Sequence, residues 1–330
     1  MRNEELSPRG VCAARARPDT QSALTFDLWP LACFVGYTFP GLMATLNDDL
    51  DRWAVRSLGW TDQTRALEFL EREPIMNAYL ISKILDEGIG GLDEHVAVFL
   101  RGELVGIAIV GWNVVMAVER SLPHETRELV VSIFADHVTR SGEAPRAIIS
   151  EGSLVEVLWK QLSCWVAPPT VWRDGQPVYV LEHMDDPSEL EAVRYARAGD
   201  LDALVPACAA MHLEEVGIDP MARDASGYRQ RIRELIAQQR SMVRFHQGKL
   251  VFKTEFSAVT TQTVQLMGVW TRPEERRHGL AKEGLREICG HLLRRHRKVS
   301  LFVNDFNAPA IALYESLGFR QIGVNRALIW

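Results

Sequence analysis

The chain has 330 residues, of which 47% are hydrophobic and 24% charged, so it is long enough for two ordinary globular domains. A formal net charge of −6 argues against a general nucleic-acid-binding protein. Its five cysteines are dispersed without a CxxC pair, and its nine histidines form no HxxxH cluster. This pattern indicates a reducing, cytoplasmic setting and no metal site.

Residues 1–50 do not fit the rest of the chain. An arginine-containing start without periodicity precedes the uncharged stretch 28–46, which is long enough for a membrane span or a signal peptide. Pro30 and Pro40 interrupt that stretch, and no basic cluster stands directly before it. We therefore interpret residues 1–50 as a non-conforming N-terminal extension, and we expect Met43 as the biological start.

Residues 51–186 have the regular patterning of one domain. The expected elements are helices from Thr61 to about Pro74 and over 77–85, a hairpin over 96–116, a helix over 128–138, a strand over 147–149, a helix over 153–162 and a strand over 178–181. The segment 185–188, with sequence DDPS, is the best candidate for a linker. It separates this domain from a second one over 191–330.

The second domain begins near Val193 with a similar succession. A helix opens at Gly199 or Asp200 and should be shifted or kinked at Pro206, and residues 211–224 are expected to form a loop and part of a partner helix. The remaining expected elements are a helix over 228–239, a hairpin over 242–259, a strand over 263–271, a helix after residue 281, a strand over 299–303 and a short helix through Tyr314.

Two hairpin turns share the pattern x-Gly-charged-Leu-Val. They are RGELV at 101–105 and QGKLV at 247–251, about one domain length apart. The pattern is compatible with coincidence between two ordinary hairpins or with two copies of one fold.

The strand over 263–271 leads into a basic turn that is suited to binding an anion. Gly279 and Ala281 let the backbone approach a ligand closely, and the following helix offers its unpaired first-turn N–H groups. Arg276 and Arg277 add positive charge to this site. A solvated basic loop is the plain structural alternative.

Two motifs carry a resemblance to the GNAT superfamily of acetyltransferases. The first is Arg276-x-x-Gly279-x-Ala281, and the second is the segment 307–319, NAPAIALYESLGF, which follows in the same order as in that superfamily. The segments VFKTEF, VQLMGVW and VNDFNAPA resemble a bacterial group that has an N-terminal domain of unassigned function before a C-terminal GNAT domain. The resemblance implies an α/β (α+β) fold with a mixed, mostly antiparallel central sheet flanked by helices, in two tandem copies.

The first copy is expected to be degenerate. After its long strand, residues 117–123 contain no Arg-x-x-Gly-x-Ala, so this copy should lack the pyrophosphate site. The catalytic copy over 191–330 is implied to bind acetyl-CoA as co-substrate. The residues implied in that binding are Val269, Trp270, Thr271, Arg276, Arg277, His278, Gly279, Leu280, Ala281, Lys282, Asn304 and Asn307. Asn307 is equally suited to capping the helix that begins at Ala308.

The catalytic groups follow from the same resemblance. Tyr314 stands where GNAT enzymes often carry a tyrosine that protonates the departing thiolate, although a core aromatic is the plain alternative. The position at which many histone-type members have a glutamate is Gln265, so Glu255 on the preceding strand becomes the candidate base. A water chain to Glu214 or Glu215 is a further route, and these acidic residues suit a cationic amine.

The sequence thus predicts a cytoplasmic, acetyl-CoA-dependent N-acetyltransferase that acts on a primary amine of a small molecule or a protein, with no nucleic-acid or membrane partner. The alternative is an acyl-CoA-sensing or interaction protein that has kept the cofactor site and lost turnover. Neither the acceptor nor the oligomeric state follows from the residues.

Overall fold

The computed structural model describes residues 52–330 except 92 and 186. The predicted extension over 1–50, with its uncharged stretch and Met43, lies outside the described residues. The described residues form one compact unit. None of the helices in the described part of the chain combines the length and the hydropathy of a membrane span.

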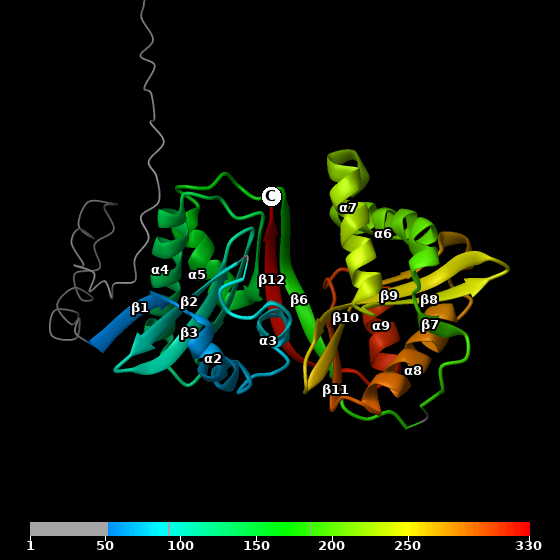
Figure 1. Ribbon diagram of the computed structural model, residues 1–330, viewed down its shortest axis with the longest axis horizontal. Coiled ribbons are helices and arrows are strands. Elements are labelled where there is room, and N and C mark those ends of the chain that lie inside the picture. Colours follow the sequence, from blue (N-terminus) through cyan, green and yellow to red (C-terminus); the bar gives the residue numbers. More distant parts are fainter. Residues whose placement is uncertain (1–51, 92, 186) are drawn as a thin grey trace, which may run out of the picture. The chain divides into compact units, whose positions relative to one another are not determined.

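The chain passes twice through the same succession of elements: a strand, two helices, three strands, a helix, a strand, a helix and a last strand (Figure 1). The first pass comprises β1 (Trp53–Ser57), α2 (Gln63–Leu70), α3 (Ala78–Glu87), β2 (Glu94–Leu100), β3 (Glu103–Val110), β4 (Asn113–Val118), α4 (His124–Ser141), β5 (Ala147–Glu151), α5 (Gly152–Leu162) and β6 (Val171–Leu181). The second comprises β7 (Val193–Tyr195), α6 (Leu201–Val216), α7 (Pro220–Ala237), β8 (Ser241–His246), β9 (Lys249–Val259), β10 (Thr263–Thr271), α8 (Leu280–Leu293), β11 (Lys298–Phe302), α9 (Ala308–Ser316) and β12 (Arg320–Ile329). Short 3₁₀ turns at Trp60–Asp62, Ala198–Asp200 and Pro273–Glu275 precede α2, α6 and α8.

All of these strands belong to one sheet of the described chain. Its order is β1-β2-β3-β4-β5-β12-β6-β11-β10-β9-β8-β7. The strands β1 to β6 of the first pass correspond to β7 to β12 of the second. The order is therefore pseudo-symmetric about the central pair, β12 and β6. Among the described strands, only β4 with β5 and β10 with β11 are parallel neighbours. The predicted mixed, mostly antiparallel sheet flanked by helices is therefore confirmed.

The last strand of each pass is exchanged between the two halves. β6 of the first pass pairs with β11 of the second, as in the partners Val180 and Ser300. β12 of the second pass pairs with β5 of the first, as in Leu328 and Ile148. β6 and β12 also pair with each other at the centre of the sheet (Figure 1). Without the other half, each half would leave unpaired strand edges.

Helices cover both faces of each half of the sheet, because the strands carry apolar residues on both sides. In the first half, α4 and α5 pack on one face and α2 and α3 on the other. In the second half, α8 and α9 cover one face, and α6 and α7 cover the other. The apolar stripe of α8 is buried, including Leu285, Ile288 and Cys289.

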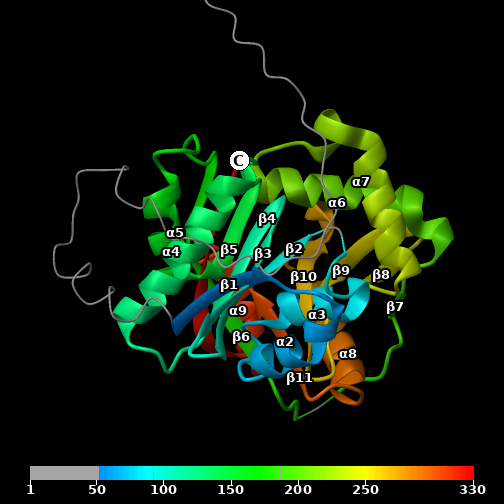
Figure 2. The same ribbon diagram turned by 60° about the vertical axis from the view of Figure 1, so that its left-hand side comes forward.

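Helix α3 of the first pass also touches the second-pass strands (Figure 2). The hydroxyl of Ser82 accepts a hydrogen bond from the Val259 N–H at 3.0 Å. Arg240 donates to Asp86 at 2.6 Å and to Ser82 at 3.1 Å. These contacts join the two halves in addition to the exchanged strands.

The faint sequence repeat coincides with the structural duplication. Arg101 and Gly102 have φ of 53° and 80°, and Gln247 and Gly248 have φ of 49° and 75°. Positive φ at both central residues belongs to the type I′ turn that joins tightly twisted hairpins. The turns connect β2 with β3 and β8 with β9, which are counterpart strands. Two copies, rather than coincidence, account for the pattern.

Two segments differ from the expectation. The segment 211–224 is predicted as a loop and part of a partner helix, but its first residues continue α6, which runs through Pro206 and ends at Gly217 with φ of 76°. The left-handed glycine, not a change in apolar pattern, stops the helix. The strand predicted over 178–181 begins seven residues earlier as β6, because β12 pairs with the segment 171–177 despite the glycine and proline in it.

Because the two halves exchange strands, we predict that they unfold together. Phe134 lies fully buried between α4 and the first-half sheet. Phe134→Ala should cost about 3–5 kcal/mol and lower the melting temperature of both halves equally in a single calorimetric transition. Phe306→Ala, at a residue that is 72% exposed, is the matched control and should change little. Two separable transitions, with only one shifted by Phe134→Ala, would contradict the coupling.

Candidate functional site

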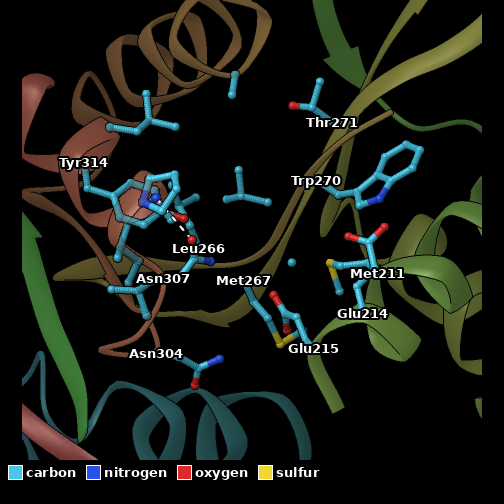
Figure 3. A pocket seen from close by; sticks show the side chains of 18 of the residues that line it. Met211, Glu214, Glu215, Leu266, Met267, Trp270, Thr271, Asn304, Asn307 and Tyr314 are labelled. Atoms are coloured by element: carbon cyan, nitrogen blue, oxygen red, sulfur yellow. Dashed lines mark hydrogen bonds between the residues drawn. The ribbon is translucent and has the colours of Figure 1, made fainter. Parts of the chain in front are cut away.

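The site is a cleft that opens where β10 and β11 separate. The two strands pair in parallel from Thr263 with Lys298 up to Leu266 with Leu301, and no further. Beyond that pair, residues from β10, β11, α6, α8, α9 and β6 enclose a cleft of about 730 Å³ (Figure 3). The cleft therefore opens between the ends of these two strands.

A bulge in β10 shapes the floor of the cleft. The register against β9 shifts between Met267 and Trp270, and Gly268 has φ of 60°. A bulge leaves backbone groups outside the ladder. Val269, Trp270 and Thr271, which the resemblance implied in cofactor binding, all line the cleft, but the Trp270 indole packs into the core beneath α6 and α7. The backbone of this strand, more than its side chains, faces the cleft.

The predicted anion-binding turn lies at one end of the cleft. Arg277 and Gly279 have φ of 66° and 84°. Gly279 is the N-cap of α8, and no side chain caps the helix. The first helical hydrogen bond runs from the Glu283 N–H to the Gly279 carbonyl at 3.0 Å. The amides of residues 280–282 therefore precede the helical ladder and are available to an anion.

Most of the residues predicted for this turn line the cleft. They are Arg276, Arg277, Gly279, Leu280, Ala281 and Lys282. His278 is exposed and does not line it. Its side chain is therefore not part of the cleft wall, although its position within the turn is as expected.

Arg276 makes contacts that the sequence did not indicate. Its guanidinium pairs with Glu214 at 2.8 Å and donates from Nε to the Thr271 carbonyl at 3.0 Å. Both partners of the ion pair are more than 40% exposed, and such pairs contribute about 0–1 kcal/mol. A multiply charged anion at the turn can therefore compete with Glu214 for Arg276.

The two asparagines of the second motif have different surroundings. Asn307 caps α9, accepting from the Ala310 N–H at 3.3 Å, so the helix-cap interpretation is confirmed. Asn304 is buried beside the cleft, and its Oδ1 accepts from Gln176 Nε2 at 3.0 Å. Both residues line the cleft.

Tyr314 projects from α9 into the cleft, opposite Glu214 and Glu215 of α6 (Figure 3). Its ring is 6% exposed and meets Phe319 edge-on at 5.9 Å. Burial, with Glu215 as a nearby negative charge, raises the pKa of the phenol. The hydroxyl makes no hydrogen bond to another described residue and remains protonated at neutral pH.

Glu215 is an ionisable group of the cleft itself. It lies in the last turn of α6 and lines the cleft beside Met211 and Glu214. Desolvation of the carboxylate at the cleft wall raises the pKa of Glu215, and the positive charges of Arg173 and Lys253 oppose that shift. By surface area the residue as a whole is exposed. A raised carboxylate pKa brings the group closer to the range of an efficient general base at neutral pH.

Glu255, the base candidate from the sequence, lies beneath the cleft floor. It is 4% exposed and forms an ion pair with Lys253 at 2.9 Å, and it accepts from the Cys208 thiol at 3.0 Å. Burial alone would raise the pKa of Glu255, but the Lys253 ammonium and the hydrogen bond from the Cys208 thiol together outweigh burial and lower it. A Cβ on Gly268, which lines the cleft, would lie 3.4 Å from Glu255 Oε2, so this carboxylate lies close behind the glycine.

Gln265 is held away from the cleft. It is 5% exposed, and its Oε1 accepts from the Ser257 hydroxyl at 2.9 Å. It does not line the cleft.

Sequence reasoning missed one wall of the site. Arg173 and Gln176 of β6, a strand of the first pass, line the cleft of the second. No motif marks them, because the strand exchange that brings them here is a long-range pairing. The only sequence clue was the run of polar residues before the apolar part of β6.

The counterpart position in the first half is closed. There β4 and β5 pair only at Asn113–Val114 with Ala147–Ile148. Past the last pair, the Ser150 hydroxyl accepts from the Met116 N–H at 2.7 Å and ties the strands together. Helix α4 begins at Pro123 without a left-handed glycine. The described first half thus has neither the opening nor the anion-binding turn.

No group of described residues has the composition of a metal site. Residues 256–328 match the family described as FR47-like protein, and residues 94–204 match a domain of unknown function, DUF4081. The second match fits the predicted N-terminal domain of unassigned function. A search of curated proteins returned no match.

Solved structures resemble the chain over most of its length. A GNAT-family acetyltransferase from Colwellia psychrerythraea has a TM-score of 0.51 at 13% identity, over 84% of this chain and 100% of that chain. A GCN5-related N-acetyltransferase from Sphaerobacter thermophilus has a TM-score of 0.51 at 18% identity, over 84% and 96%. A tandem GNAT protein from the clavulanic acid biosynthesis pathway has a TM-score of 0.50 at 14% identity, over 84% and 98%.

At these identities the similarity concerns the fold. The chain has the GNAT fold, as its two sequence motifs predicted, and its C-terminal part carries the FR47-like region.

Proposed function

We propose that the protein is an acetyl-CoA-dependent N-acetyltransferase that acetylates a primary amine. The opening between β10 and β11, with the anion-binding turn at one end and Tyr314 and Glu215 on facing walls, carries this proposal. A cytoplasmic location fits the free cysteines at 164, 208 and 289.

The residues of the turn fit the pyrophosphate of acetyl-CoA. The amides of 280–282 lie at the N-terminus of α8, where the helix dipole favours a negative charge. Arg276 and Arg277 supply two cations beside them. The bulged backbone of Val269 and Thr271 offers hydrogen-bonding groups to the pantetheine arm, as the family resemblance implies.

Acetyl-CoA supplies a thioester carbonyl carbon that an amine attacks, so that a C–N bond forms as the C–S bond breaks and the thiolate leaves with the electron pair. An amine with a pKa near 10.4 is largely protonated at pH 7, so a base must first remove a proton. Glu215 fits that role because it lines the cleft and its pKa is raised. Glu255 remains a candidate that would act past Gly268, although its pair with Lys253 lowers its basicity.

Tyr314 is positioned to return a proton to the thiolate. It faces the cleft with a protonated hydroxyl that no other described residue engages. A free thiol has a pKa near 8.5, so this acid accelerates departure without being indispensable.

Gly279→Asp tests the anion-binding turn. The substitution puts a side chain on a residue with φ of 84° and adds negative charge where the pyrophosphate is proposed to bind. Acetyl-CoA affinity measured by calorimetry should fall by at least about tenfold, which corresponds to 1.4 kcal/mol. Gly142→Asp is the matched control, because Gly142 has φ of 74° at the end of α4 with nothing nearby. Equal affinity in both variants would place the pyrophosphate elsewhere.

Tyr314→Phe separates acid catalysis from packing. The variant keeps the ring against Phe319 and removes the hydroxyl, so kcat should fall about 10²-fold while acetyl-CoA affinity holds. Tyr314→Ala should also lose about 3–5 kcal/mol of stability, as a large buried aromatic does. If Tyr314→Phe turns over as fast as the wild type, Tyr314 is not the catalytic acid and contributes only to packing.

Glu215→Gln and Glu255→Gln decide the base. If Glu215 is the base, its Gln variant should lose about 10²-fold in kcat at neutral pH. In the wild type, kcat should fall as the pH drops through the raised pKa of Glu215, because the protonated carboxyl accepts no proton; the variant should lack this limb. Glu255→Gln leaves Lys253 as an uncompensated buried cation and should cost about 3–5 kcal/mol of stability. If kcat of Glu215→Gln still falls at low pH as in the wild type, Glu255 would be assigned as the base instead.

A further inference from the structure

The first part of β6 forms one wall of the cleft. Against β12, Asn325 pairs with Gln176 and Ala327 pairs with Arg173, so β6 has one residue more than β12 between these pairs. Residues two apart on β12 share a face, and their partners Arg173 and Gln176 therefore share a face as well. This bulge turns both side chains into the cleft.

Gln176 presents an unused hydrogen-bond acceptor to the cleft. The residue is 1% exposed, and its Nε2 is fixed by donating to Asn304 at 3.0 Å. Its Oε1 is buried without a hydrogen-bond partner. A buried acceptor left unsatisfied costs about 1–3 kcal/mol. A ligand that donates an N–H at this position would satisfy it.

Arg173 presents a cation that the Glu215 carboxylate stabilises electrostatically without a direct ion pair. It donates to the backbone carbonyl of Glu215 at 3.2 Å, and its Nε is buried without a partner. Burial lowers the pKa of this guanidinium, and no carboxylate among the described residues pairs with it. The hydrogen bond from Arg173 to the Glu215 carbonyl supports the end of α6. It uses one of the five N–H donors of the guanidinium and leaves the others for an anion.

The wall next to Arg173 is acidic. Glu215 faces the cleft from the last turn of α6, and Glu214 beside it is engaged by Arg276. An amine cation can therefore interact with Glu215 and the Gln176 oxygen, while an anion can interact with Arg173. A single guanidinium among these acceptors suits a carboxylate better than a phosphate dianion, which would meet more negative than positive charge.

We propose that the acceptor is a zwitterion of the amino-acid class, with its amine directed to Glu215 and the Gln176 oxygen and its carboxylate bound by Arg173. The inference rests on the proposed N-acetyltransferase function and adds the substrate class. It also assigns to β6, a strand of the first half, a role in choosing the acceptor.

The test compares matched acceptors with the full-length protein at saturating acetyl-CoA. Glycine, β-alanine, 4-aminobutyrate and lysine span different amine-to-carboxylate distances, and each is paired with the corresponding amide. For at least one pair, kcat/KM for the acid should exceed that for the amide by about tenfold to a hundredfold, as expected for a charge-assisted hydrogen bond. Arg173→Met should bring that ratio close to one, and Arg173→Lys should retain part of it.

Arg326→Met is the matched control. Arg326 lies on β12, pairs with Glu156 at 3.4 Å and Asp174 at 3.3 Å, and does not line the cleft. Its removal changes the net charge equally and should leave the ratio intact. The proposal would be overturned if the amides were acetylated with the same kcat/KM as the acids. It would also be overturned if Arg173→Met left the acid-to-amide ratio of kcat/KM unchanged.

A binding readout separates this inference from the proposed function. The melting temperature of the full-length protein with CoA is measured with each N-acetyl amino acid and with its amide. The acid should raise it, and Arg173→Met should abolish the rise. The absence of a rise with every acid, or an equal rise with the amides, overturns the inference whether or not turnover is seen. Failure of acetyl-CoA itself to stabilise the protein would instead refute the proposed function.

Discussion

The pairing of β6 with β12 at the centre of the sheet is the constraint on which the rest of the molecule depends. Each strand completes the other half: β6 hydrogen-bonds to β11, and β12 hydrogen-bonds to β5. Because the exchange is reciprocal, the sheet continues through both halves without an interior edge. It also carries Arg173 and Gln176 from the first half to the cleft of the second, so the first half contributes directly to the site.

The two halves show what the same topology needs in order to bind a ligand. In the second half, β10 bulges at Gly268, and β10 and β11 separate after Leu266 and Leu301. In the first half, Ser150 closes the equivalent position by bonding the backbone of Met116. The left-handed Gly279 that opens α8 has no counterpart before α4, which begins after a proline. One duplicated fold thus provides a site in one half and a scaffold in the other.

Local patterns allowed much of this to be predicted from the sequence. The helix stripe of α8, the hairpin glycines 102 and 248, and the turn at Gly279 each depend on neighbouring residues, and the structure has all of these elements. The exchange of β6 and β12 depends on partners more than a hundred residues apart, which no local pattern encodes. Glu287 shows the same limit. It reads as a surface residue of α8, yet its buried carboxylate accepts three backbone N–H groups from residues 191–193.

The central claim is that acetyl-CoA binds at the turn that opens α8 and at no equivalent place in the first half. Hydrogen–deuterium exchange of the full-length protein with and without acetyl-CoA tests it most directly, because the amides of 280–282 precede the helical ladder and should exchange rapidly in the free protein. We predict protection of residues 277–282 on binding, with residues 119–123 unchanged. Unaltered exchange over 277–282 at saturating acetyl-CoA, or protection that appears at 119–123 instead, would contradict the account.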